Sequence, residues 1–116
     1  IPDKPYVYIL TRSYYRQLLL AGVRIYEYTP GFIHAKMYVS DDAVAVVGSA
    51  NMDFRSLYLH FENCCAFYGG EIVQDVRGDI ESCFAAGREV TLEEVDATSW
   101  HRRLLQILFR FFAPLM

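Results

Sequence analysis

The amino-acid sequence predicts an α/β fold, and three features of the chain support this prediction. Segments rich in β-branched and aromatic residues alternate with segments whose apolar residues recur at intervals of three and four. No internal repeat, low-complexity stretch or linker rich in proline and serine interrupts this alternation. The length of 116 residues is that of one domain. We therefore expect a single domain, residues 1–116, in which helices cover strands.

The first part of the chain is expected to form a strand, a helix and a second strand. Residues 6–10 have the character of a short strand. Residues 11–21 place apolar side chains at helical spacing, and Gly22 stands where such a helix would end. Residues 23–28 are β-branched and aromatic, which predicts the second strand.

The middle of the chain is expected to form a hairpin and one further strand. Strands over residues 35–40 and 43–47 meet across Asp41 and Asp42, a short polar link suited to a hairpin. Residues 64–68 form an apolar run that two glycines end, and this run predicts the next strand.

Two helices are expected in the last part of the chain. Residues 71–86 repeat apolar side chains at three and four, so one face of this helix should be buried. Residues 99–116 predict an amphipathic C-terminal helix in which aromatic residues and leucines are mixed with arginines. This helix either packs against the domain or lies in a membrane interface, with its arginines on anionic headgroups.

The composition narrows the class of protein. The formal net charge of −3 and the pI of about 5.5 disfavour a nucleic-acid-binding module. Hydrophobic residues make up 53% of the chain, so some of the surface should meet a partner. No run approaches the roughly 20 apolar residues that span a bilayer, and no signal sequence opens the chain. The chain begins at Ile1 without an initiator Met, and we expect a soluble or surface-associated segment of a longer protein.

The three cysteines do not form a pattern that binds metal. Cys64, Cys65 and Cys83 contain no CxxC pair, and an odd number with two adjacent members suits neither a disulfide framework nor a zinc site. We expect buried, reduced thiols, and no metal or other cofactor.

The chemistry of the chain is concentrated between residues 34 and 62. His34 and Lys36, followed by Asp41, would project from one face of a strand, because residues two apart on a strand share a face. A neutral imidazole can attack phosphorus or transfer a proton near neutral pH, and the neighbouring ammonium offsets the charge of a phosphate. The pattern therefore predicts a phosphate-directed site.

A second group of polar residues follows the next predicted strand. Ser49 and Asn51 come after Gly48, a residue type that lets a backbone approach a ligand closely, and both can donate hydrogen bonds to phosphate oxygens. Glu62 stands before the strand over residues 64–68, where its carboxylate could hold a histidine nitrogen.

These residues resemble the HKD motif of the phospholipase D superfamily. The resemblance is carried by HAKMYVSD and GSANMDFRS, with Glu62 downstream. It is closer still to bacterial cardiolipin synthases, because YEYTPGFIHAKMYVSDD and GSANMDFRSLYLHFE look like their second HKD segment and LLQILFRFFAPLM looks like their C-terminus. The resemblance implies a phospholipase D-like fold, a mixed sheet flanked by helices, of which this chain is one HKD half in a two-half or homodimeric architecture.

The resemblance also implies a role for each candidate residue. His34 would be the catalytic histidine and Glu62 the carboxylate that orients it. Asp41 is implied to be a structural hydrogen-bonding residue more than a direct participant. The implied catalytic residues are His34, Lys36, Glu62 and Asp41, and the implied phosphate-binding residues are Lys36, Ser49 and Asn51.

Family enzymes use two histidines, one that forms a phosphohistidine intermediate and one that acts as general acid and base. Only one HKD motif is present in this chain, so the resemblance implies a second HKD half or a homodimer as partner. As part of a second half, His34 is more readily the acid and base than the nucleophile, although both roles stay open in homodimeric relatives.

The function favoured by the resemblance is phosphatidyl transfer at a bacterial inner membrane, giving cardiolipin and glycerol from phosphatidylglycerol. A phospholipase D or nuclease with the same site, and a half-domain that only binds phospholipid or a partner, are the alternatives. His60 and His101 have no comparable neighbours in the sequence and are expected to be incidental. Asp53 and Arg55 either form an ion pair that fixes their loop or touch substrate.

Overall fold

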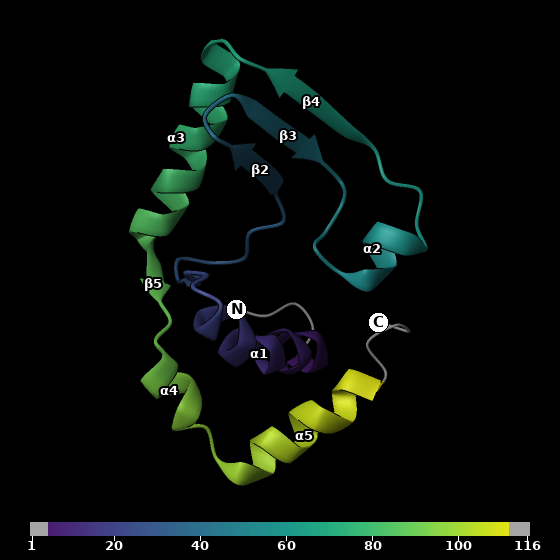
Figure 1. Ribbon diagram of the computed structural model, residues 1–116, viewed down its shortest axis with the longest axis vertical. Coiled ribbons are helices and arrows are strands. Elements are labelled where there is room, and N and C mark those ends of the chain that lie inside the picture. The colour runs from purple at the N-terminus through teal and green to yellow at the C-terminus, as the bar shows by residue number, and fades with distance from the viewer. Residues whose placement is uncertain (1–4, 112–116) are drawn as a thin grey trace. The chain divides into compact units, whose positions relative to one another are not determined.

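The structure is a computed structural model that describes residues 5–111 (Figure 1). Its internal contacts divide the chain into two compact units. The central unit is Ile33–Ala86, and the terminal unit is Ile1–Phe32 together with Gly87–Met116. Helices and small antiparallel sheets occur in the described part of the chain, which confirms the α/β class. The single domain expected from chain length stays a prediction, and the two units are described separately below.

The central unit is built on a three-stranded antiparallel sheet. Its strands are β2 (Lys36–Ser40), β3 (Val44–Gly48) and β4 (Cys64–Tyr68), in the order β2-β3-β4. Helix α3 (Glu71–Ala86) follows β4, and the short helix α2 (Phe54–Tyr58) lies in the connection between β3 and β4. The predicted strand over residues 64–68 and the predicted helix over residues 71–86 are both confirmed.

The core of the central unit lies between α3 and one face of its sheet. Ala45, Val73 and Val76 are buried there. The register pairs Val39 with Ala45 and Ala45 with Phe67, so these side chains share the face that packs on the helix. The buried face of α3 that its apolar spacing predicts is therefore confirmed. The partly buried side chains around this core are Met37, Val39, Val47, Phe67 and Ile80.

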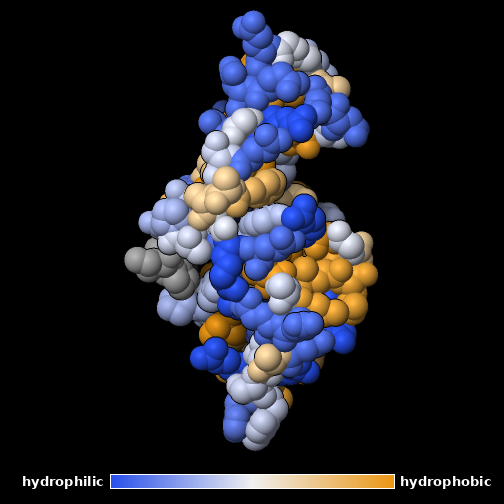
Figure 2. Space-filling view, turned by 90° about the vertical axis from the view of Figure 1, so that its left-hand side faces the viewer, coloured by the Kyte–Doolittle hydropathy of each residue, from blue (hydrophilic) through white to orange (hydrophobic). Residues whose placement is uncertain are grey.

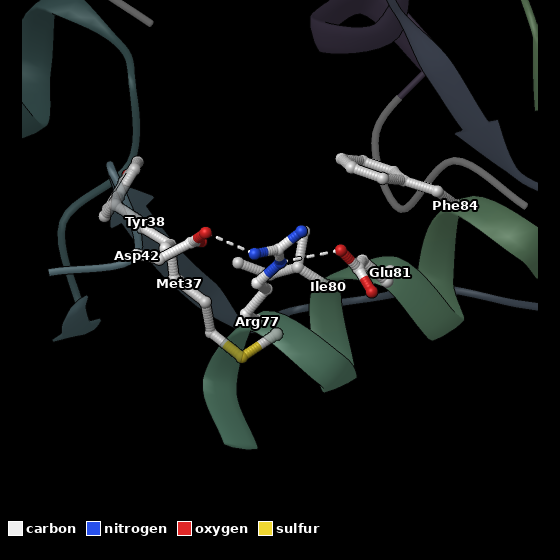
Figure 3. A pocket seen from close by; sticks show the side chains of 8 residues that line it. Met37, Tyr38, Asp42, Arg77, Ile80, Glu81 and Phe84 are labelled. Atoms are coloured by element: carbon white, nitrogen blue, oxygen red, sulfur yellow. Dashed lines mark hydrogen bonds and ion pairs between the residues drawn. The ribbon is translucent and has the colours of Figure 1, made fainter. Parts of the chain in front are cut away.

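The link between β2 and β3 is the predicted hairpin turn. Asp41 and Asp42 adopt φ angles of 50° and 53°, the left-handed values that a two-residue turn of type I′ needs at both central positions. The Ala43 amide donates to the Ser40 carbonyl at 3.0 Å and closes the turn. Arg77 of α3 pairs with Asp42 and also with Glu81, at the edge of a hollow between β2 and α3 (Figure 3).

The terminal unit contains two strands and three helices. Strands β1 (Tyr26–Tyr28) and β5 (Gly87–Glu89) pair antiparallel. Helix α1 (Pro5–Leu20) precedes β1, and helices α4 (Leu92–Asp96) and α5 (Trp100–Phe111) follow β5. The predicted C-terminal helix is present as α5, and its last predicted residues, 112–116, lie outside the described part of the chain.

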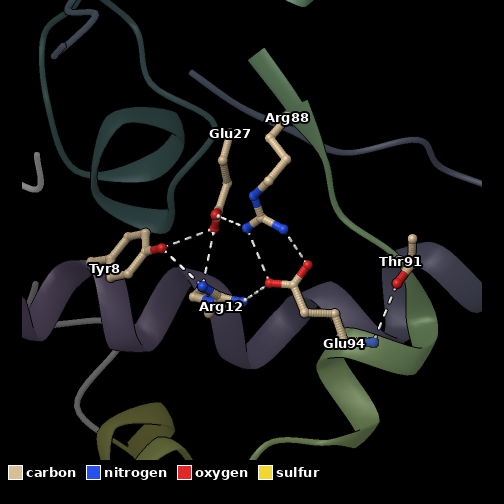
Figure 4. A network of polar contacts seen from close by, with 6 residues as sticks. All are labelled: Tyr8, Arg12, Glu27, Arg88, Thr91 and Glu94. Carbon is tan, nitrogen blue, oxygen red and sulfur yellow. Dashed lines mark hydrogen bonds and ion pairs between the residues drawn. The ribbon is translucent and has the colours of Figure 1, made fainter. Parts of the chain in front are cut away.

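A network of charged side chains joins four elements of the terminal unit (Figure 4). Arg12 of α1 donates to Glu94 of α4 at 3.0 Å, and Arg88 of β5 donates to Glu27 of β1 at 2.9 Å. Arg88 also pairs with Glu94, and the Tyr8 hydroxyl donates to Glu27 at 3.0 Å. Every charge of this network therefore faces an opposite charge.

Three expectations about the fold are corrected. The strand predicted over residues 6–10 is wrong, because these residues form the first turns of α1. Helical spacing there lets the Arg12 guanidinium lie 5.6 Å from the Tyr8 ring and 5.7 Å from the Tyr15 ring, which a strand would not allow. The strand predicted over residues 23–28 is shortened to three residues, Tyr26–Tyr28. The mixed sheet is not observed, because both sheets within residues 5–111 are antiparallel.

Candidate active site

The antiparallel register brings three segments of the candidate site to one end of the central sheet. Lys36 begins β2, Gly48 ends β3 and Cys64 begins β4, and Gly48 is paired with both of the others. Ser49 follows Gly48 directly, and Glu62 precedes Cys64 by two residues. Residues that lie far apart in the sequence therefore meet at this end of the sheet.

Asp41 lies at the opposite end of β2 from the rest of the candidate site. The whole strand Lys36–Ser40 separates it from His34, and the stretch from residue 34 to residue 41 spans roughly 23 Å along an extended chain. The Asp41 carboxylate accepts a hydrogen bond from the neighbouring Ser40 hydroxyl at 3.2 Å. Its place in the hairpin turn agrees with the structural role expected for Asp41.

His34 and Lys36 do not form the strand pair that their spacing predicts. Strand β2 begins at Lys36, so His34 lies in the irregular segment before it, and this expectation is wrong. The two residues nevertheless meet, because the Lys36 ammonium donates to the His34 carbonyl oxygen at 2.6 Å. His34 is exposed and Lys36 is half-buried.

Ser49 and Glu62 form the closest side-chain contact of the site. The Ser49 hydroxyl donates to Glu62 Oε2 at 2.5 Å and accepts from the Asn63 amide at 2.9 Å. The Ser49 amide in turn donates to the Asn63 carbonyl at 3.0 Å. These bonds extend the β3–β4 pairing past Gly48 and fix the Glu62 side chain beside Ser49.

Asn51 and the buried Ser56 form a second layer around this contact. The Asn51 side-chain amide donates to the Ser56 hydroxyl at 3.3 Å. The Ser56 amide donates to Asp53 at 2.7 Å, so Asp53 caps helix α2. No ion pair joins Asp53 to Arg55 among the described residues, and the loop is fixed by this cap instead. Ser56 was not predicted from the sequence, although Asp53 is a residue type that commonly caps the start of a helix.

The surroundings of Glu62 favour its charged form. Hydrogen bonds from the Ser49 and Ser56 hydroxyls lower the pKa of the Glu62 carboxyl and outweigh the effect of desolvation, and the nearby His60 and Lys36 lower it a little further. Glu62 is therefore an anion near neutral pH. His60, which the sequence analysis treated as incidental, belongs to the surroundings of this carboxylate. The pairing of Glu62 with His34 stays a prediction.

The close approach of β4 to β3 requires a glycine at position 48. A Cβ atom at this position would lie 2.6 Å from Cys64 Cα and would also overlap the Asn63 carbonyl oxygen. Such contacts are far inside van der Waals distance, so any side chain here would push β4 away from β3. The approach of a ligand to Gly48, which the sequence suggested, stays a prediction.

Tyr38 fixes the loop that carries Ser49 and Asn51. Its side chain is on the same sheet face as that of Lys36, and its hydroxyl donates to the Ala50 carbonyl at 2.7 Å. The loop after β3 is therefore held at the face on which Lys36 lies.

The cysteines of the described residues are free thiols, and two of the three are exposed. The three thiols are free, but Cys64 and Cys65 are exposed and Cys83 is half-buried, which corrects the expectation of buried thiols. Cys64 projects from the sheet face opposite α3, and no helix of the central unit packs on that face within residues 33–86. Across residues 5–111 no group of three or more histidine, cysteine, aspartate or glutamate residues could hold a metal ion.

A comparison with known protein families assigns the chain. Residues 1–84 match the family described as "Cardiolipin synthase, PLD-like domain". The chain therefore belongs to the phospholipase D-like domains. Within that class it is a member of the cardiolipin synthase, PLD-like domain family. The family assignment made from the HKD motif is confirmed.

Curated relatives match the chain over its whole length. An uncharacterized protein of Streptococcus mutans serotype c is 40% identical over 116 residues, which is all of this chain and 25% of that protein. Cardiolipin synthase 2 of Bacillus anthracis is 38% identical, and a cardiolipin synthase of Geobacillus kaustophilus is 39% identical, each matching 99% of this chain. The chain spans about a quarter or less of the length of these relatives. No solved structure matches it.

None of the helices within residues 5–111 combines the length and the apolar character that crossing a bilayer requires.

Proposed function

We propose that this chain supplies one half of the active site of a phosphatidyltransferase that makes cardiolipin from two phosphatidylglycerol molecules and releases glycerol. The main support is the meeting of the HxK segment, Ser49 and Glu62 at one end of the central sheet. The names of the relatives from Bacillus anthracis and Geobacillus kaustophilus, both cardiolipin synthases, agree with this chemistry. The full-length protein would work at the inner membrane of a bacterial cell.

The proposed reaction proceeds in two displacements at phosphorus. A histidine nitrogen attacks the phosphate of the donor phosphatidylglycerol, and the bond to the glycerol oxygen breaks while a second histidine gives that oxygen a proton. The second histidine then removes the proton from a hydroxyl of the acceptor phosphatidylglycerol. That oxygen attacks phosphorus, and the bond from phosphorus to the first histidine breaks.

In this scheme the residues of the chain have separate tasks. The Lys36 ammonium would offset the charge that builds on the phosphate oxygens, with Ser49 and Asn51 donating hydrogen bonds. Glu62, which its neighbours keep anionic, would accept a hydrogen bond from the ring N–H of His34 and so hold the ring in one tautomer. Ser49 already donates to Glu62, so its contact with phosphate would require the hydroxyl to rotate.

The second histidine would come from another HKD half, supplied by the rest of a longer protein or by a second copy of the chain. His34 can be the nucleophile or the general acid and base, and the two roles are distinguishable. Phosphohistidine trapped at His34 would identify it as the nucleophile, and its absence in a trapped, active enzyme would identify it as the acid and base.

A product analysis tests the proposed function. The chain is supplied with its second HKD half and incubated with labelled phosphatidylglycerol. Cardiolipin that appears together with free glycerol supports the proposal, whereas phosphatidic acid as the sole lipid product would mean that the site hydrolyses its substrate. Release of nucleotides from DNA without any lipid turnover would contradict the proposal altogether. The net charge of −3 leads us to expect no such release.

A further inference from the structure

Helix α5 presents its apolar side to the outside of the terminal unit. Five large side chains follow one another along this helix at spacings of three and four or side by side, and they form what we call the α5 stripe. Their exposed fractions are 67% for Trp100, 52% for Leu104, 54% for Ile107, 51% for Leu108 and 78% for Phe111. None of the residues of α5 is buried.

The polar side of α5 makes the contacts with the rest of the terminal unit. The Arg110 guanidinium donates to the Ser13 hydroxyl at 3.0 Å and lies 4.5 Å from the centre of the Tyr14 ring, and Ser13 and Tyr14 both belong to α1. Arg103 donates to the Asp96 carboxylate of α4 at 3.4 Å. An amphipathic helix that packs on its own domain buries its apolar side. In the terminal unit α5 packs on α1 with its arginine side and leaves the stripe at least half exposed, so the packing interpretation and the interfacial interpretation of its sequence both stay open.

Surface hydrophobic residues are common along this chain (Figure 2). Those of the α5 stripe differ from the others in the charges of the residues beside them in the helix. The twelve residues of α5 include three arginines and no acidic residue, in a chain whose net charge is −3. Two copies of this helix packed stripe to stripe would bring like charges together. A negatively charged surface would instead attract the helix.

We propose that the α5 stripe docks on an anionic lipid surface. The three arginines give α5 a positive charge that an anionic surface attracts at a distance, while the stripe enters the acyl boundary. Trp100 at the start of the helix has the ring type that favours this boundary. The proposal does not rest on phosphatidyl transfer, because lipid docking needs neither His34 nor a second HKD half.

The chain carries its own reporter for this docking. Trp100 is the single tryptophan of the sequence and belongs to the stripe, so its fluorescence reports the surroundings of the stripe alone. We expect a blue shift of its emission when the 116-residue chain meets vesicles of phosphatidylglycerol and phosphatidylcholine. Vesicles of phosphatidylcholine alone, or added salt, should weaken the shift.

A pair of variants tests the stripe directly. The double change Leu104→Glu with Leu108→Glu places two carboxylates in the stripe and should weaken vesicle binding by at least about tenfold. The control is Leu20→Glu, which changes a leucine of the same unit that is 59% exposed on α1 and should bind as the unchanged chain does. Circular dichroism confirms that both variants keep their helices, and His34→Ala should keep full binding.

Two results would overturn the proposal. Equal binding by the folded stripe variant and the control would mean that another surface holds the lipid. A blue shift that grows with protein concentration in the absence of vesicles, together with a dimer in sedimentation, would mean that a second copy covers the stripe.

Discussion

The two units of the chain use charged side chains in opposite ways. In the terminal unit, Arg12 and Arg88 each face carboxylates of Glu27 or Glu94, and the four elements they join are held by matched charges. At the sheet end of the central unit, Lys36 and Glu62 lie close enough for the lysine to lower the pKa of the glutamate, yet they form no ion pair within the described residues. Lys36 donates to a backbone carbonyl and Glu62 accepts from a serine.

This difference teaches how to separate structural charges from chemical ones. A matched pair has little attraction left for a third charge, whereas an ammonium bound only to a neutral carbonyl keeps its full charge for an arriving phosphate. The central site is therefore suited to bind an anion, and the terminal network is suited to hold elements together. Four experiments test the roles of the two units, in order of decreasing expected effect.

The largest effect is expected from His34→Ala in the enzyme with both HKD halves. Loss of either a nucleophile or a general acid and base should lower the rate of cardiolipin formation by at least about 10³-fold. The exposed position of His34 means that the thermal midpoint should change little. Turnover of labelled phosphatidylglycerol and a melting curve measure the two effects, and normal turnover would remove His34 from the chemistry.

The second effect compares Lys36→Met with Arg88→Met. Because the Lys36 ammonium would stabilise charge on the phosphate, its loss should lower the rate by about 10²-fold and leave stability nearly unchanged. Arg88→Met should do the opposite, since Arg88 is bound to Glu27 and Glu94. Activity and melting measured on both variants would refute the division of roles if the two behaved alike.

The third effect is on stability alone. Gly48→Ala forces a methyl group against Asn63 and Cys64, and we expect it to lower the free energy of unfolding by about 1–3 kcal/mol. Urea unfolding measures this loss. Gly31→Ala is the control, because a Cβ atom there meets nothing within 4 Å and should cost little.

The smallest effect concerns acid stability in the terminal unit. Arg88 and Arg12 lower the pKa of the Glu94 carboxyl, so its contribution to stability is present above the ordinary glutamate pKa of about 4.3 and is lost as the pH falls through the lowered value. Glu94→Gln should remove this pH dependence. It should lower the free energy of unfolding at neutral pH by only about 1 kcal/mol or less, because the Arg88 and Glu94 side chains are both partly solvated. Melting curves from pH 3 to pH 7 test it (roughly the range of glutamate titration), and an unchanged acid limb would contradict it.

The sequence predicted those elements whose signals are local. The Asp41-Asp42 turn, the strand over residues 64–68 and the helix over residues 71–86 agree with the structure because turn chemistry, β propensity and helical spacing act over a few residues. The strand predicted over residues 6–10 is wrong, because β-forming side chains can also occur in a helix when tertiary contacts favour it. In this helix Arg12 contacts the rings of two tyrosines. Strand β5 depends on pairing with β1, which lies far away in the sequence. Helix α4 was missed although Thr91 and Glu94 form a recognisable helix-start signal.

The sequence named the candidate residues of the site but could not predict the contacts between them. The motif led us to His34, Lys36, Ser49, Asn51 and Glu62, whose roles stay a prediction, and the family match supports the family alone. It could not reveal that Ser49 bonds Glu62, because this contact depends on the register of β3 and β4 across a connection that contains α2. Nor could spacing alone show that β2 begins only at Lys36.

The left-handed turn at Asp41 and Asp42 has a consequence for how relatives of this chain are found. Aspartate tolerates a φ of 50° because its short side chain bonds locally, but asparagine and glycine tolerate it equally well. We therefore expect the third letter of the HKD motif to serve a bend in the backbone here rather than the reaction. A database query that insists on aspartate at this position would discard enzymes with intact chemistry whose hairpin is closed by Asn-Gly.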